Sequence, residues 1–178
     1  MTDIADLEIP GVLRLRAAVE PAVPLVFDSP HSGNVYPDDF GAAAPVADLR
    51  PAEDAFIDDL YAAAPELGAS LLTALFPRLY IDPNRMETDM DPAEIAGEWD
   101  GPPLAPGSAS KLPAAALKAR IEGYHQPYHQ TLARVLDAAA ARFGGYYHID
   151  CHSMPSVATD MSPEPTGTLR PDFTLGSR

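Results

Sequence analysis

The chain has few cysteines, few basic residues and no long apolar run. Cys151 is the only cysteine in the sequence, so an internal disulfide is excluded. Lysine and arginine number 12 against 26 aspartates and glutamates. The formal charge of −14 argues against nucleic acid or an anionic membrane as a partner, because both need a basic surface. No apolar stretch approaches the roughly 20 residues of a membrane span, and no signal-peptide pattern opens the chain. We therefore expect a cytoplasmic protein.

Length and apolar content indicate one folded domain. A chain of 178 residues with 46% apolar content can form a core covered by helices, so we expect a single domain over residues 1–178. Twenty prolines and 12 glycines predict long, shaped loops, and the loop over 82–110 is of the kind that carries function.

Short apolar runs alternate with helical patterns. We predict strands at 23–28, 69–75, 78–81, 146–151 and 172–175, the one at 146–151 being buried, and an edge strand near 12–15. Helices are predicted at 52–64, on an apolar stripe of Phe56, Ile57, Leu60 and Tyr61, and at 114–142, with a break near Pro127. The buried face of the second helix comprises Leu117, Ile121, Tyr124, Tyr128, Leu132, Val135 and Leu136.

This alternation predicts an α/β fold, a three-layer α/β/α domain with a mixed, largely parallel sheet. A covering helix normally follows a strand in this class, whereas only three residues follow the strand at 172–175. We therefore expect a C-terminally truncated member of its fold family.

Two histidines follow predicted strands in the same way. His31 comes after the strand that ends at Asp28, and His152 comes after the strand that ends near Asp150. Open α/β sheets bind ligands at the carboxyl edge of their strands. The pair therefore predicts a metal site with neutral imidazole ligands. The alternative is that each histidine only caps its loop through backbone hydrogen bonds.

A catalytic zinc site needs a third protein ligand. Asp54 is our choice, Glu53 is a second candidate, and Asn34 is a weaker one. Glu53 and Asp54 also suit the positive end of the predicted helix, which leaves a purely helix-stabilising role open. Asp28 and Asp150 are candidates to orient the imidazoles, or else to cap loops.

Asn84 and Arg85 lie on the loop that leaves the predicted strand 78–81. A guanidinium binds a carboxylate bidentately, so the pair predicts a grip for an acidic substrate. A surface ion pair of Arg85 with Glu87 or Asp89 is the alternative.

Three further kinds of residue could line the cleft. His125 and His129 lie four residues apart and are expected to form a partly buried, hydrogen-bonded pair there. Ser32 and Ser153 adjoin the two strand-end histidines, but neither has the sequence context of a nucleophile. Cys151 is expected to be an inert buried residue.

Taken in order, these motifs resemble the N-formylglutamate amidohydrolases from about residue 20 to the C-terminus. The segments that carry the resemblance are Ser29–Pro37, Glu53–Asp54, Asp82–Arg85, Pro127–His129, Asp150–Ser153 and Arg170–Gly176.

The resemblance implies a fold of the phosphorylase/carboxypeptidase type and one zinc ion. It implies hydrolysis of N-formyl-L-glutamate to formate and L-glutamate in histidine breakdown. His31 and His152 match the metal histidines, and Asp54 is taken as the third ligand. Asn84 and Arg85 match the substrate grip, to which we add His129 and Ser153 as substrate-binding residues.

The chain departs from the pattern at two points. Asn34 stands where carboxypeptidase-like enzymes have a metal-binding glutamate. The general-base glutamate of such enzymes follows the Arg-Pro-Asp motif and has no counterpart here, since Glu164 lies in a Pro-rich loop. Two alternatives therefore stay open, a hydrolase of other N-acyl amino acids and a metabolite-binding module without turnover.

Overall fold

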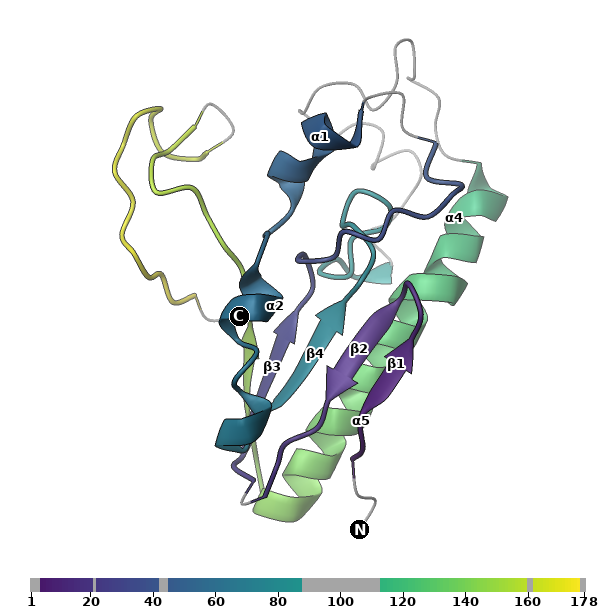
Figure 1. The fold of residues 1–178 in the computed structure, drawn as a ribbon, viewed down its shortest axis with the longest axis vertical. Helices are drawn as coiled ribbons and strands as arrows, with labels where there is room; N and C mark the ends of the chain where they lie inside the picture. Colours follow the sequence, from purple (N-terminus) through teal and green to yellow (C-terminus); the bar gives the residue numbers. More distant parts are fainter. Residues whose placement is uncertain (1–3, 21, 42–44, 88–112, 160–161, 177–178) are drawn as a thin grey trace.

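A mixed sheet forms the centre of the molecule in a computed structural model that describes residues 4–20, 22–41, 45–87, 113–159 and 162–176 (Figure 1). Its strands are β1 Leu7–Ile9, β2 Leu13–Arg16, β3 Leu25–Ser29, β4 Ser70–Ala74 and β5 Tyr147–Asp150. They lie in the order β1-β2-β4-β3-β5. β3 pairs in parallel with β4 and β5, whereas β2 pairs antiparallel with β1 and β4.

A long helical segment covers one face of this sheet. It consists of α4 Ala114–Arg120, the π-helical turn η4 Ile121–His125 and α5 Gln126–Phe143. Tyr128 and Val135 pack with Val26 of β3 in the main core cluster, which confirms the predicted helix and its buried face. The expected break is the π-helical turn just before Pro127. Proline has no amide hydrogen to donate, so a regular helical ladder cannot continue through it.

Shorter helical turns follow one another between β3 and β4. They are α1 Val46–Leu49, η1 Arg50–Ala52, α2 Ile57–Leu60 and η2 Pro65–Leu67. Alternate residues of β3 face opposite ways, so Phe27 points away from α5 and packs on Tyr61 with ring centroids 5.1 Å apart. Helical segments therefore lie on both faces, as the predicted α/β fold with a mixed sheet requires.

The predicted helix over 52–64 is wrong. Glu53 has extended backbone (φ −82°, ψ 144°) and Phe56 is left-handed (φ 68°), so only η1 and the single turn α2 are helical in this region. Phe56 and Leu60, two members of the predicted apolar stripe, are 72% and 71% exposed. The amide of Asp54 instead donates to the His31 carbonyl, and this contact with the β3 loop replaces a helical hydrogen bond.

Two predicted strands are also absent. Residues 78–81 form a turn closed by the Tyr80 amide and the Pro77 carbonyl, and Arg120 donates to the Tyr80 carbonyl that a strand would use for pairing. Residues 172–175 are not a strand, and Phe173 and Leu175 are 86% and 97% exposed. An apolar pattern makes a strand only where a partner strand and a covering layer are present.

The strands at the two edges of the sheet also differ from the prediction. β2 was expected at the edge but lies inside, because the three-residue strand β1 pairs with its outer side. β5 was expected to be buried but is an edge strand, with Tyr147 74% and Ile149 39% exposed. Within the described residues, no helix is both long and apolar enough to cross a membrane. Residues 88–110 of the predicted functional loop lie outside the described residues.

Candidate metal centre

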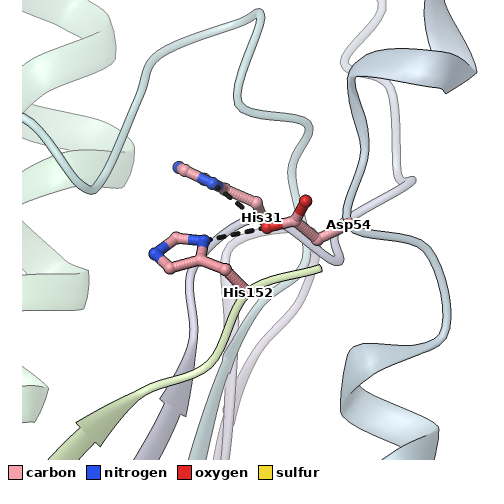
Figure 2. A group of neighbouring side chains, drawn as sticks. All are labelled: His31, Asp54 and His152. Carbon is pink, nitrogen blue, oxygen red and sulfur yellow. Dashed lines mark hydrogen bonds and ion pairs between the residues drawn. The ribbon is translucent and has the colours of Figure 1, made fainter. Parts of the chain in front are cut away.

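The parallel pairing of β3 and β5 brings His31 and His152 together. The register aligns Asp28 with Asp150, and the amide of Cys151 donates to the Asp28 carbonyl at 2.8 Å. The carboxyl ends of both strands, and the loops that follow them, therefore lie at the same end of the sheet. The two imidazole rings lie there with centroids 4.7 Å apart (Figure 2).

Asp54 completes the group from the segment after η1. Its amide donates to the His31 carbonyl at 2.9 Å, which holds the extended backbone beside the β3 loop. Asp54 Oδ2 lies 2.8 Å from His152 Nδ1 and 3.5 Å from His31 Nδ1 (Figure 2). The ligand atoms of the three residues all lie within 4.8 Å of one another. Two imidazoles and a carboxylate are a donor set found at catalytic zinc sites.

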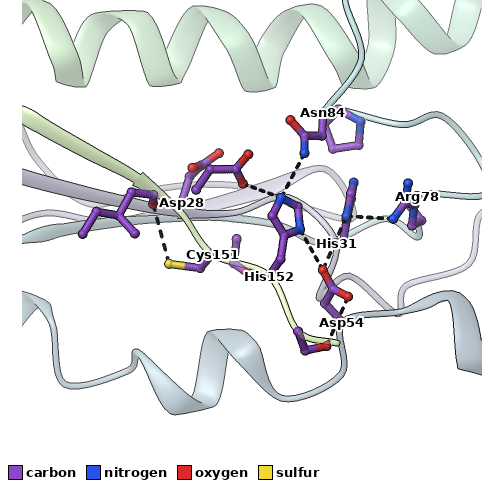
Figure 3. Close-up of polar contacts among 12 residues, drawn as sticks. Asp28, His31, Asp54, Arg78, Asn84, Cys151 and His152 are labelled. Carbon is purple, nitrogen blue, oxygen red and sulfur yellow. Dashed lines mark hydrogen bonds and ion pairs between the residues drawn. The ribbon is translucent and has the colours of Figure 1, made fainter. Parts of the chain in front are cut away.

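The neighbours of His31 determine its tautomer. Arg78 Nη1 lies 3.1 Å from His31 Nδ1 (Figure 3). Asp82 Oδ1 lies 2.7 Å from Nε2. Because a guanidinium only donates, Nδ1 is the acceptor and Nε2–H donates to Asp82. This lone pair accepts from Arg78, so a metal held by His31 Nδ1 beside Asp54 would replace that hydrogen bond. A carboxylate behind a histidine in this way is typical of metal sites.

The surroundings of His152 provide a test of whether a metal fits. His152 Nε2 lies 2.9 Å from Asn84 Nδ2 and 3.0 Å from Asp150 Oδ1. That Asp150 oxygen is buried and has no hydrogen bond. Because the amide nitrogen of Asn84 only donates, His152 Nε2 accepts from it, and the ring proton lies on Nδ1, which is 2.8 Å from Asp54 Oδ2. A metal bound through Nδ1 would replace that proton, and the buried Asp150 oxygen adds negative charge that favours a cation beside His152.

The charges around the group favour a cation. Burial acts to raise the pKa of Asp54, but its contacts with His152 and His31 outweigh burial and lower that pKa below its usual range. At Asp82 the same opposition between burial and contacts with His31 and Arg78 lowers the pKa to about 2. Contacts with Asp150 and then Asp54 raise the pKa of His152 to about 9. A proton or a metal ion is thus stabilised between carboxylates that are ionised at neutral pH.

A cavity of about 310 Å³ adjoins the metal group through Asn84. It is lined by Pro83, Asn84, Arg85, Met86, Glu87, His125 and His129. Three of the four residues predicted to bind substrate therefore share this cavity. The fourth, Ser153, lies at the metal group, where its Oγ donates to Asp54 Oδ1 at 3.1 Å.

Other candidates are not part of the group. Asn34 is exposed. Glu53 is buried and accepts from the Tyr36 hydroxyl at 2.5 Å. Asp28 contacts Tyr128 and His148 at 2.7 and 2.8 Å, whereas Asp150 does contact the histidine that it was expected to orient. Cys151 is buried, and burial raises the pKa of its thiol to about 12.

Sequence reasoning missed two residues at this site, Arg78 and Asp82. Both contact His31 and each other, with Arg78 Nη2 2.7 Å from Asp82 Oδ2. Asp82 opens the Asp-Pro-Asn-Arg motif, so its place beside Asn84 and Arg85 was a usable signal. Arg78 carried none, because the contact depends on the turn that follows Pro77.

Comparisons with known proteins point to one family. The sequence model of the N-formylglutamate amidohydrolases matches residues 23–178. The chain is 32% identical over 167 residues to the N-formylglutamate deformylase of Pseudomonas putida, and 33% identical over 171 residues to that of Pseudomonas aeruginosa. Each match covers 87% of this chain and 59% of the relative.

Two solved structures are also similar to this chain. The N-formylglutamate amidohydrolase of Ralstonia eutropha JMP134 is 43% identical with a TM-score of 0.73, over 87% of this chain and 63% of that one. A gene product of Agrobacterium tumefaciens, 18% identical with a TM-score of 0.62 over 82% of this chain and 57% of that one, shares the fold. The chain thus spans about three fifths of the length of these proteins.

Proposed function

This chain belongs to the N-formylglutamate amidohydrolase family, and we propose that it hydrolyses N-formyl-L-glutamate to formate and L-glutamate at a zinc centre of His31, Asp54 and His152. We further propose that this reaction serves histidine breakdown. The names of the two Pseudomonas relatives support the substrate. The chain spans 59% of the length of these two relatives.

The single observation that carries the proposal is the convergence of the three donor atoms within 4.8 Å. The three residues come from separate segments of the chain, so no local turn explains why they meet. Asp82 behind His31 supports the tautomer that a metal at Nδ1 needs, and Asp150 places a second carboxylate beside His152. A zinc ion bound at such a site supplies a Lewis acid and a water of lowered pKa.

The remaining residues are proposed to bind and orient the substrate. Arg85 is 40% exposed at its side chain and lines the cavity beside the metal group, where its guanidinium can bind a carboxylate of the glutamate part. Asn84 lies between this cavity and His152, so its amide can bind the same end of the substrate. Holding that end fixes the position of the formyl amide relative to the metal group.

We assign no residue as general base. Glu164 is exposed, and its Oε2 accepts from Arg170 Nη2 at 2.8 Å. An alternative function is therefore that the chain binds the acidic metabolite at the metal group without hydrolysing it.

Zinc binding is the first test. The purified chain is stripped with a chelator, reloaded with zinc and analysed for metal content, in parallel with a His31→Ala, His152→Ala double variant. We expect about one zinc per wild-type chain and none in the double variant. Equal zinc in both proteins would rule out this centre.

Turnover is the second test. The zinc-loaded chain is incubated with N-formyl-L-glutamate and followed by proton NMR, with N-acetyl-L-glutamate, N-formyl-L-aspartate and N-formyl-L-leucine as matched substrates. Formate released only from the formyl dicarboxylates would support the proposed activity. Cleavage of the acetyl compound or of the leucine compound at a similar rate would favour a broader N-acyl amino acid hydrolase. Binding by calorimetry without formate release would favour the metabolite-binding module.

A further inference from the structure

Two neighbouring histidines of the long helical segment line the cavity beside the metal group. His125 ends the π-helical turn η4, and His129 lies in the first turns of α5. Their ring centroids are 4.3 Å apart. Neither ring belongs to the metal group, and both line the cavity with Asn84 and Arg85.

Both histidines contact the backbone of the substrate-gripping loop. His129 Nε2 lies 2.8 Å from the Pro83 carbonyl, and His125 Nε2 lies 2.8 Å from the Arg85 carbonyl. A carbonyl only accepts, so both rings carry their proton on Nε2 and donate it. The two bonds reach residues just before and just after Asn84, and together they fix the path of the chain on either side of it.

The same segment is also fixed from the metal group. Asp82, which holds His31, accepts from the amide of Asn84 at 2.9 Å, and the Asn84 side chain lies 2.9 Å from His152. The loop over 82–85 is thus held by the metal group on one side and by the helical histidines on the other. Such double support is what keeps a binding group in its productive geometry.

The placement of His125 is energetically unfavourable. The ring is 5% exposed and its Nδ1 is buried without a hydrogen-bond partner, so one polar atom stays unsatisfied while the other donates to Arg85. Burial lowers the pKa of His125, which keeps the ring neutral. The π-helical turn that ends at His125 is itself a rare form that occurs often at functional sites. Core packing alone explains neither the buried, unpaired Nδ1 of His125 nor the π-helical turn.

We propose that His125 and His129 are positioning residues that hold Asn84 and Arg85 ready for the carboxylate of the substrate, through hydrogen bonds to the Arg85 and Pro83 carbonyls. The inference rests on the proposed function for the identity of the substrate. It adds that affinity for the substrate depends on two histidines that do not belong to the metal group.

The test compares variants that lose the donor with variants that keep it. His125→Leu and His129→Leu fill similar space without an N–H. His125→Gln and His129→Gln carry an amide N–H at nearly the position of Nε2. The exposed Gln130 of α5 provides a control, Gln130→Leu, for the effect of a leucine on this helix.

The first readout needs no substrate. Amide hydrogen exchange at Asn84 and Arg85 is measured by NMR on the zinc-loaded proteins, together with the ring ¹⁵N shifts of wild-type His125 and His129. We expect Nε2–H tautomers, and exchange about tenfold faster in each leucine variant, the size of one lost hydrogen bond. The glutamine variants and Gln130→Leu should stay near wild type. Nδ1–H tautomers, or unchanged exchange in the leucine variants, would overturn the proposal.

The second readout measures affinity for N-formyl-L-glutamate by calorimetry, and KM and kcat where turnover occurs. Each leucine variant should weaken binding about tenfold and raise KM with little change in kcat, while zinc content stays constant and glutamine restores affinity. Equal weakening by leucine and glutamine would overturn the role of the hydrogen bonds. If wild type binds no N-formyl-L-glutamate, the proposed substrate fails, and the exchange measurement still decides the positioning role.

Discussion

The two strands that supply the histidines of the proposed metal centre carry the same sequence pattern but have different surroundings. β3 lies between β4 and β5, and its histidine, His31, has a side chain that is only 2% exposed. β5 lies at the edge of the sheet, and the side chain of His152 is 34% exposed. Within the described residues, one histidine of the proposed centre is therefore buried and the other is partly exposed.

The difference in burial predicts different roles of the two histidines in stability. His31 is fixed by Asp82 and Arg78 at the same time. His152 contacts Asp54, Asn84 and Asp150, which surround a ring that is still open to solvent. We expect the β3 ligand to support both folding and metal binding, and the β5 ligand to support metal binding alone.

Single alanine variants of the two histidines should separate these roles. His31→Ala and His152→Ala should each weaken zinc binding by at least about 100-fold, because each removes one of three protein ligands. His31→Ala should also lower the free energy of unfolding by about 2 kcal/mol, since it leaves buried polar groups without their partner. His152→Ala should cost less than about 1 kcal/mol. Competition with a zinc-binding dye and urea unfolding of the metal-free proteins measure the two quantities. Equal losses of stability would remove the contrast between the strands.

The carboxylates behind the two histidines allow a finer test. Asp82→Asn should weaken zinc binding by about 10–100-fold, because His31 loses the charged partner that orients its ring. Asp150→Asn should have an effect below about tenfold, since His152 also contacts Asn84. The dye competition used for the histidine variants measures both affinities. A larger effect at Asp150 would mean that the exposed ligand depends more on its support than the buried one.

Local patterns in the sequence were sufficient to predict the parallel strands and the long helical segment that covers them. Apolar runs that end in polar loops located β3, β4 and β5, and a helical repeat located the segment from α4 to α5. The parallel pairing that follows from such alternation is enough to place His31 and His152 together.

Contacts between distant segments could not be predicted in this way. Asp54 and Glu53 both suited a helix start, and only the extended backbone at Glu53 sends their side chains to different partners. The contact of Asp82 with His31 joins residues 51 apart and depends on the turn after Pro77. The exposure of β5 depends on what covers it, which the apolar run Tyr146–Ile149 does not encode.

A glycine in the β3 loop allows a third prediction. A Cβ on Gly33 would lie 2.2 Å from the Phe76 carbonyl oxygen, a backbone atom that cannot move aside cheaply. Gly33→Ala should therefore cost about 1–3 kcal/mol of unfolding free energy. Gly145, which precedes β5 and has open space at its Cβ position, is the matched control. Urea unfolding of the two alanine variants measures the difference, and a Gly33→Ala protein as stable as Gly145→Ala would show that the β3 loop is not tightly packed.

Core truncation should follow the same contrast between β3 and β5. Val26 is 2% exposed in β3, and Val26→Ala should cost roughly 2 kcal/mol. Ile149 is 39% exposed in β5, and Ile149→Ala should cost less than about 1 kcal/mol although it removes more atoms. Thermal and urea unfolding of both variants give the ranking. A larger loss at Ile149 would mean that β5 is covered in solution.

The smallest expected effect concerns His148, which joins the two strands through a 2.8 Å hydrogen bond to Asp28. This bond is the main reason that the pKa of His148 is raised. A histidine whose pKa is higher in the folded than in the unfolded protein adds stability that is fully present below its unfolded pKa of about 6.5 and is lost as the pH rises through the folded value. His148→Gln should therefore cost up to about 1 kcal/mol near pH 6 and progressively less at higher pH.

The measurement is the difference in unfolding free energy between wild type and His148→Gln across that pH range. Groups that titrate in both proteins, among them His152, cancel in this difference, so it isolates the contact between β5 and β3. A difference that stays constant with pH would mean that His148 is neutral and joins the strands through packing and an uncharged hydrogen bond. A difference that grows with pH would mean that its folded pKa is lowered, so that the edge strand is held more by burial than by charge.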